Sequence, residues 1–65
     1  MEINVTAVRL AMVDAGMTVS QLAKAAHVSQ ATAIRYASKG GNSSPATFHK
    51  IGQALGVKPS SLVKI

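Results

Sequence analysis

The chain has 65 residues with a formal net charge of +5 at pH 7, and it contains no cysteine. A chain of this length folds as one small domain, which excludes large enzymes, multidomain arrangements and repeat arrays, and without cysteine it holds neither a disulfide scaffold nor a thiolate zinc site. Hydrophobic residues make up 48% of the sequence, and most are alanine or aliphatic, which favours an all-α fold of short, closely packed helices.

The first predicted helix covers residues 3–15, where apolar residues recur with helical spacing, and Gly16 follows as a C-terminal stop. A second helix begins after Thr18. Thr18 and Gln21 have the spacing of a capping box, in which each side chain binds the backbone N–H of the other residue. The second helix ends near residues 26–28.

Ser29 is a residue type that caps helices, and it predicts a third helix over about residues 30–38. This helix stops at Gly40 and Gly41, which we interpret as a plain hinge inside a polar loop. Ser44 followed by Pro45 predicts the start of a fourth helix.

The fourth helix is expected to bury Phe48, Ile51 and Leu55 and to end at Gly56. A last short helix follows from residue 58. The sequence therefore predicts about five short helices, and it has no alternating pattern that would indicate a strand.

The second and third helices are separated by only about three residues, which is the spacing of a helix-turn-helix. We place this unit at about residues 18–38. Leu22 anchors its first helix, Ala23 is small enough for a close helix crossing, and Val28 fills the corner. Ala33 and Tyr36 are predicted to lie on the buried side of the third helix.

Positive charge dominates the chain after its first helix. Both acidic residues, Glu2 and Asp14, lie in the first fourteen positions, whereas six of the seven Lys and Arg residues follow them. A compact basic domain without neutralising acids indicates a polyanionic partner, and the alternative is a basic surface that serves only solubility.

The sequence contains no signal for export or for membrane insertion. Its apolar runs are far shorter than the ~20 residues that span a bilayer, and its first residues lack the pattern of a signal peptide. We therefore expect a cytoplasmic protein. The initial Met and the complete set of helices favour a protein that stands alone.

Two stretches carry the pattern of a known family. The first reads Met17-Thr18-Val19-Ser20-Gln21-Leu22-Ala23 and continues at Val28-Ser29-Gln30-Ala31-Thr32. The second reads Ser44-Pro45-Ala46-Thr47-Phe48-His49-Lys50-Ile51-Gly52-Gln53-Ala54-Leu55-Gly56-Val57. They resemble the helix-turn-helix and the fourth helix of phage lambda-type repressors and Cro proteins, over about residues 8–63. The resemblance implies a sequence-specific regulator that binds a double-stranded DNA operator and blocks or redirects polymerase.

Four positions depart from the residues usual in that family. His27 stands in place of Gly in the turn, where a positive φ would cost a non-glycine residue about 1 kcal/mol. Val19 replaces Gln, which removes a candidate phosphate contact. Ala33 is smaller than the usual Ile or Val, and Ala37 replaces Glu.

The outward face of the third helix is the expected DNA-reading surface. Its residues are Ser29, Gln30, Ala31, Ile34, Arg35, Ser38 and Lys39. Gln30 can bind adenine, Arg35 can bind guanine or phosphate, and Ala31 or Ile34 can contact a thymine methyl group. If the register is shifted by one residue, Ile34 instead joins the core.

Other chemistry has weaker support. Ser61 and Lys64 match an S-x-x-K pattern, but no second catalytic set accompanies them. His27 and His49 lack companion metal ligands. We therefore expect no enzyme activity, no cofactor and no metal.

The sequence leaves open two alternatives to DNA binding and the possibility of a homodimer. The same fold could serve as a protein-interaction module, such as an anti-repressor or an antitoxin component, or the chain could be a basic peptide at a membrane surface. A homodimer, formed in solution or only on DNA, would read two half-sites. Leu62, Val63 and Ile65 are its candidate contacts, unless they close the core of the monomer.

Overall fold

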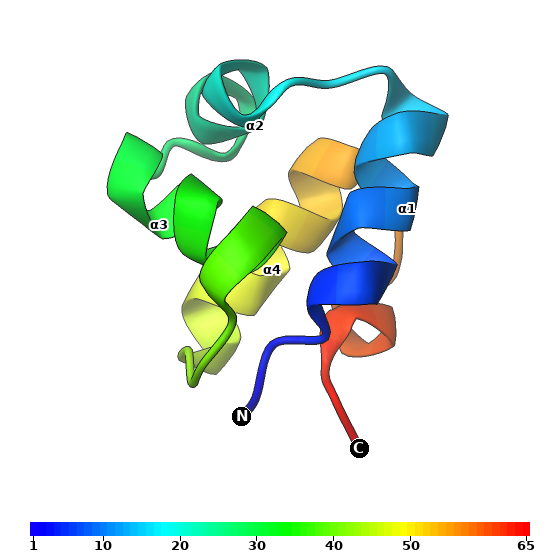
Figure 1. Cartoon of the computed structure of the whole chain (residues 1–65), viewed down its shortest axis with the longest axis vertical. Coiled ribbons are helices and arrows are strands. Elements are labelled where there is room, and N and C mark those ends of the chain that lie inside the picture. Colours follow the sequence, from blue (N-terminus) through cyan, green and yellow to red (C-terminus); the bar gives the residue numbers. More distant parts are fainter.

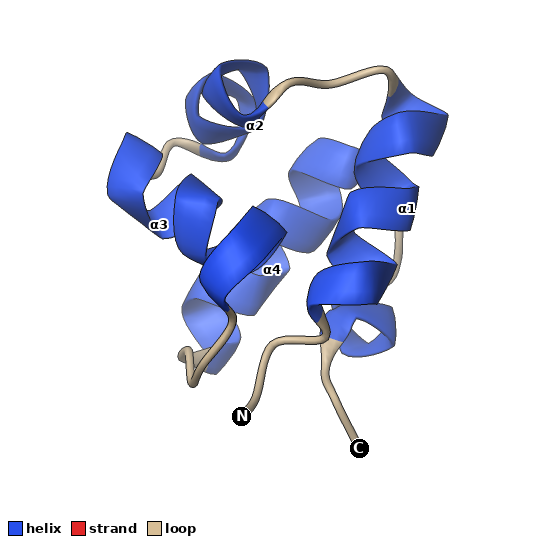
Figure 2. Ribbon diagram, viewed as in Figure 1, coloured by secondary structure: helices blue, strands red, loops and turns tan.

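The computed structural model describes all 65 residues and is mostly helical, with two isolated β-bridges and no strands. The elements in chain order are α1 (Val5–Ala15), α2 (Val19–Ala26), α3 (Gln30–Ile34), a π-helical turn η1 (Arg35–Lys39), α4 (Pro45–Leu55) and a 3-10 turn η2 (Pro59–Leu62). In Figure 1, α4 lies behind the centre, with α3 to its left, α1 to its right and α2 above. Figure 2 shows the short loops that join them. The all-α prediction is confirmed, and no helix is long and apolar enough to cross a bilayer.

Side-chain caps set the starts of three helices where the sequence predicts them. The Thr18 hydroxyl accepts a hydrogen bond from the Gln21 backbone N–H at 3.2 Å, and the Gln21 carboxamide oxygen accepts one from the Thr18 N–H at 2.9 Å. Ser29 and Ser44 cap α3 and α4, each accepting from the backbone N–H three residues later, at 3.1 and 3.3 Å. These bonds satisfy N–H groups that have no partner within the helix.

The first helix begins two residues later than predicted. Asn4 is its N-cap, and the Asn4 side-chain oxygen accepts a hydrogen bond from the Ala7 N–H at 3.1 Å. Ile3 is extended because its own N–H is bound to the Gly41 carbonyl, at 2.8 Å, outside the helix. Ala15, which has the spacing of the buried face, is exposed at the end of α1.

One cluster of buried hydrophobic side chains forms the core. Its members are Ile3, Val8, Ala11, Met12, Leu22, Ala23, Ala26, Ala33, Tyr36, Ala37, Phe48, Ile51, Leu55 and Leu62. The rings of Tyr36 and Phe48 meet edge to face, with centroids 5.3 Å apart and planes at 75°. Val28 is partly buried against this cluster, so the expected anchors of the helix-turn-helix all contact the core.

The C-terminal residues mostly close the monomer. Leu62 is 1% exposed and belongs to the core, so the expectation that it contributes to a dimer contact is wrong. Val63 is half-buried and pairs with Ile3 through the backbone. Only Ile65 remains fully exposed among the three candidates.

A glycine in α4 allows η2 to pack closely. A Cβ atom on Gly52 would lie 2.8 Å from both Cα and Cγ of Pro59. Real Cβ atoms do not approach other atoms so closely, so only glycine fits this position without a shift of η2.

Gly40 is more than the plain hinge that the sequence suggests. It is buried with a φ of 74°, and a Cβ atom there would lie 3.1 Å from a methyl group of Val5. Its N–H donates to the Arg35 carbonyl at 2.7 Å, five residues back, which closes the π-helical turn. Gly40 therefore ends η1 and lets the chain pass under the start of α1.

Candidate nucleic-acid interface

The turn between α2 and α3 has the geometry of a helix-turn-helix corner. His27 is left-handed, with φ 56° and ψ 43°, and it is the only non-glycine residue with positive φ. The Val28 N–H donates to the Ala23 carbonyl at 3.1 Å, which satisfies a carbonyl at the end of α2. The strained turn residue expected from the sequence is thus present at His27.

The first residue of α3 contacts α2 through its side chain. The Gln30 amide nitrogen donates to the Ser20 hydroxyl at 3.1 Å. This bond fixes the direction of the amide and leaves the Gln30 carboxamide oxygen without a protein partner. No local pattern in the sequence indicates this contact, because it depends on how α2 and α3 cross.

All seven residues of the predicted outward face are exposed in the structure. Ile34 is 38% exposed, whereas Ala33 and Tyr36 are completely buried. The alternative register, in which Ile34 joins the core, is therefore wrong. The exposed row runs from Ser29 along α3 to Lys39 at the end of η1.

Arg35 is held by the loop that follows its own helix. Its guanidinium group donates a hydrogen bond to the backbone carbonyl of Asn42. Because a guanidinium carries five N–H donors, the remaining donors stay available to another partner.

Tyr36 supports the buried side of the same helix. Its hydroxyl donates to the Ser43 hydroxyl at 2.5 Å. Burial raises the pKa of Tyr36 above the ordinary value of 10.0, and the hydrogen bond to Ser43 and the positive charge of Arg35 act in the opposite direction. The neutral phenol therefore ties η1 to the loop at neutral pH.

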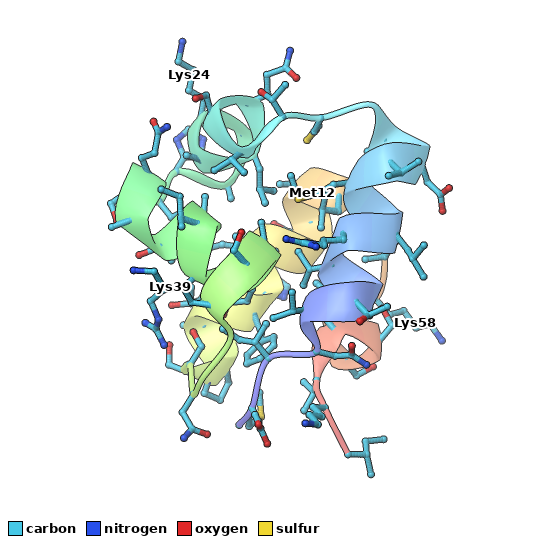
Figure 3. The ribbon with its side chains drawn as sticks, in the orientation of Figure 1. Met12, Lys24, Lys39 and Lys58 are labelled. Atoms are coloured by element: carbon cyan, nitrogen blue, oxygen red, sulfur yellow. The ribbon has the colours of Figure 1, made fainter.

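The lysines are spread over more than one side of the molecule. Figure 3 shows Lys39 on the side that carries α3, Lys24 beyond α2, and Lys58 on the opposite side beside η2. Lys64 lies 3.8 Å from a Glu2 carboxylate oxygen, and both side chains are largely exposed. Such an exposed pair contributes little to stability.

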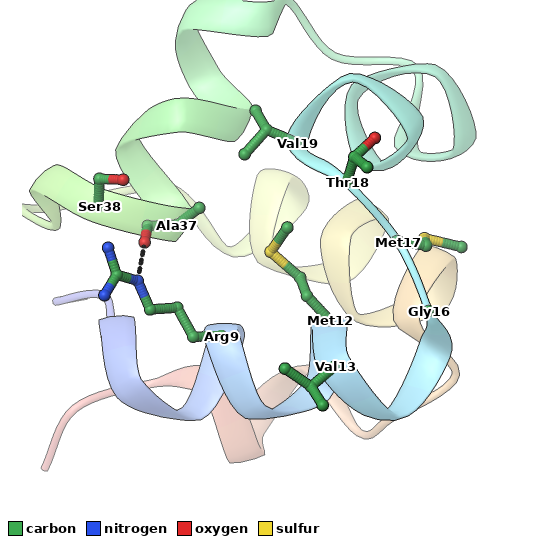
Figure 4. Close-up of a pocket in the computed structure, with 9 residues that line it drawn as sticks. All are labelled: Arg9, Met12, Val13, Gly16, Met17, Thr18, Val19, Ala37 and Ser38. Carbon is green, nitrogen blue, oxygen red and sulfur yellow. Dashed lines mark hydrogen bonds between the residues drawn. The ribbon is translucent and has the colours of Figure 1, made fainter.

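Arg9 is a cation near α3 that the predicted site did not include. Its Nε–H donates to the Ala37 carbonyl at 2.6 Å (Figure 4), and a positive charge is favourable at this C-terminal end of a helix. Beside it lies an open hollow of about 510 Å³, whose apolar lining includes Met12, Val13 and Met17. The only sequence signal for Arg9 is that it is the single cation of the first helix.

A comparison with protein-family models gives a match described as helix-turn-helix, over residues 8–62. Comparisons with curated proteins and with solved structures give no match. The matched residues include all of the core except Ile3, together with the left-handed turn and the exposed row of α3 and η1. The chain belongs to the helix-turn-helix family of lambda-type repressors and Cro proteins, which bind double-stranded DNA and regulate transcription.

Proposed function

We propose that residues 1–65 act as one operator-binding domain of repressor or Cro type, which inserts α3 into the major groove. The observation that supports this most strongly is the continuous exposed row on α3 and η1, whose opposite side is locked by Ala33 and Tyr36. A helix fits the major groove, where each base pair presents a distinct pattern of donors and acceptors. No carboxylate side chain after Asp14 would repel the phosphates.

The residues near the start of α3 are assigned to base edges. Gln30 is the first helical residue, and its amide can bind adenine through one donor and one acceptor. Ala31 and Ile34 are exposed apolar side chains that can contact thymine methyl groups. Arg35 follows on the same face and can bind guanine or phosphate.

The residues at the two ends of the row are assigned to the DNA backbone. Lys39 is exposed at the last position of η1, where phosphate is its nearer target. Ser29 and Ser38 carry exposed hydroxyl groups that can bind phosphate oxygens. Backbone contacts of this kind set the position of the helix, and base contacts give the sequence preference.

The test starts by selecting bound sequences from random duplex DNA, which identifies a cognate site. Gln30→Ala should then weaken cognate binding by about 1–3 kcal/mol and hardly change binding to random DNA. Lys39→Ala should weaken both equally and reduce the salt slope by about 0.9. Lys58→Ala is the matched control, because this exposed lysine lies on the side away from α3.

Two results would contradict the proposal. If Gln30→Ala left the ratio of cognate to random affinity unchanged while Lys39→Ala abolished it, α3 would not be the reading helix. If the affinity for duplex DNA hardly changed between low and moderate salt, phosphate contacts would not drive binding.

The proposed mechanism is occupancy of the operator, since the family is regulatory rather than catalytic. One such domain reads few base pairs, so we propose that two copies bind half-sites about 34 Å apart. Ile65 is exposed and remains a candidate contact between the copies. A 1:1 complex on a palindromic site at saturating protein would exclude this dimer.

A further inference from the structure

The first four residues lie between two other segments of the chain and bind both of them. On one side, the Ile3 N–H donates to the Gly41 carbonyl and the Ser43 N–H donates to the Met1 carbonyl, each at 2.8 Å. The Ile3 side chain is 2% exposed, so packing as well as hydrogen bonding holds this segment in place. We call residues 1–4 the N-terminal segment.

On its other side, the N-terminal segment binds the end of the chain. The Asn4 N–H donates to the Leu62 carbonyl at 2.8 Å, and the Lys64 N–H donates to the Glu2 carbonyl at 2.7 Å. The Leu62 side chain is buried in the core, so the end of the chain that binds the N-terminal segment is itself held in place. The N-terminal segment is thus a bridge between the folded core and the loop at residues 40–43.

That loop is the part of the protein that holds the C-terminal half of the proposed reading helix. The Asn42 carbonyl accepts a hydrogen bond from the Arg35 guanidinium, and the Ser43 hydroxyl accepts one from Tyr36. Gly40 and Gly41 both have positive φ, a conformation that glycine adopts without strain, and the position of the loop depends on the bonds that hold it.

We propose that the N-terminal segment is a positioning element of the DNA interface: it holds the Asn42 carbonyl where that carbonyl orients the Arg35 guanidinium. This inference rests on the proposed function, in which Arg35 faces DNA. The N-terminal segment itself does not touch the DNA in this proposal. It acts through the loop.

The physical basis is the conformational freedom of a long side chain. A free Arg side chain loses rotamer entropy when DNA immobilises it, which weakens binding. Arg35 is exposed, and its hydrogen bond to Asn42 restricts it before DNA arrives. The N-terminal segment supports this restriction, because it holds the loop through Gly41 and Ser43.

The test is a double-mutant cycle between the N-terminal segment and Arg35, measured as affinity for the cognate duplex. Ile3→Val and Ile3→Ala loosen the segment in two steps, and Ile3→Val removes one methyl group, which the fold tolerates. We expect Ile3→Ala to weaken cognate binding about two- to tenfold, the effect of immobilising one long side chain, with a smaller loss for Ile3→Val. In an Arg35→Ala background, both Ile3 variants should change affinity less than twofold.

Ile51→Val is the matched control, because it removes the same methyl group from a completely buried residue of α4 away from the loop. It should lower stability as Ile3→Val does and leave cognate affinity unchanged. A direct readout accompanies the cycle: the Arg35 Nη2–H signal in NMR, from the nitrogen that donates to Asn42, should exchange faster with water in Ile3→Val than in Ile51→Val.

The outcomes separate this inference from the proposed function. If Arg35→Ala leaves cognate affinity unchanged, Arg35 does not contact DNA, and both its assigned role and this inference fail. If Arg35→Ala weakens binding but the Ile3 variants cost the same with and without Arg35, the assigned role stands and the inference is wrong. If Ile51→Val weakens binding as much as Ile3→Val, the effect is loss of stability, and the inference is again wrong.

Discussion

Gly52→Ala should destabilise this protein, although the same change usually stabilises a helix. Gly52 lies inside α4, where Ala is intrinsically about 1 kcal/mol more favourable than Gly. Here the new Cβ would lie 2.8 Å from Cα and Cγ of Pro59 and 2.9 Å from its nitrogen. Two of these three are backbone atoms of the next element, so η2 must move as a unit to relieve the contact.

The expected magnitude follows from the two opposing effects. Overpacking of this kind costs about 1–3 kcal/mol, so a net loss of about 1 kcal/mol remains after the gain in helix propensity. In a domain of this size, such a loss lowers the midpoint of thermal unfolding by about 4–8 °C.

Thermal unfolding followed by circular dichroism measures this shift. The control is Gln53→Ala, which alters the exposed neighbour in the same helix and should stay within about 0.5 kcal/mol of the parent. If Gly52→Ala unfolded at a higher temperature than the parent, the close contact between α4 and η2 would be refuted.

Three further predictions follow from single contacts. Ser20→Ala removes the partner of the Gln30 amide and, in a binding titration, should lower the affinity for the cognate duplex less than Gln30→Ala does. The affinity for random DNA should not change, and a larger loss of cognate affinity than that of Gln30→Ala would contradict this prediction. His27→Gly should raise the free energy of unfolding by about 1 kcal/mol in a urea titration, because glycine adopts the left-handed turn without strain, and a loss of stability would show that the His27 side chain makes a needed contact. Burial raises the pKa of Tyr36, so its contribution to stability is complete below about pH 10 and is lost as pH rises through the folded-state pKa. Tyr36→Phe should therefore have a flatter decline of unfolding free energy in alkaline solution, and equal slopes for the two proteins would refute the assignment.

The features that could be predicted from the sequence are those encoded by neighbouring residues. Thr18 and Gln21 specify the start of α2 through a three-residue spacing, and Ser29 specifies the start of α3 in the same way. The exposed row could be predicted because Ala33 and Tyr36 fix which side of the helix is buried. Such local signals need no knowledge of the rest of the fold.

The features that escaped prediction depend on residues far apart in the sequence. Ile3 is extended because a carbonyl almost forty residues later binds its N–H. The positions of Gln30 and Arg35 depend on Ser20 and Asn42, which approach them only after the helices have packed. Local sequence patterns do not indicate these long-range contacts. The directions of the Gln30 and Arg35 side chains could therefore be determined only from the structure.

The π-helical turn forms the second half of the exposed row. Residues 30–34 have regular α-helical hydrogen bonding, and the extra residue is accommodated only between Arg35 and Lys39. A natural deletion of one residue in η1 would convert that turn into ordinary α-helix and would leave Gln30 and its neighbours in place. Under the proposed function, such a change would alter the DNA contacts of Arg35, Ser38 and Lys39 and would leave those of Gln30 in place, so the two halves of the row can vary separately.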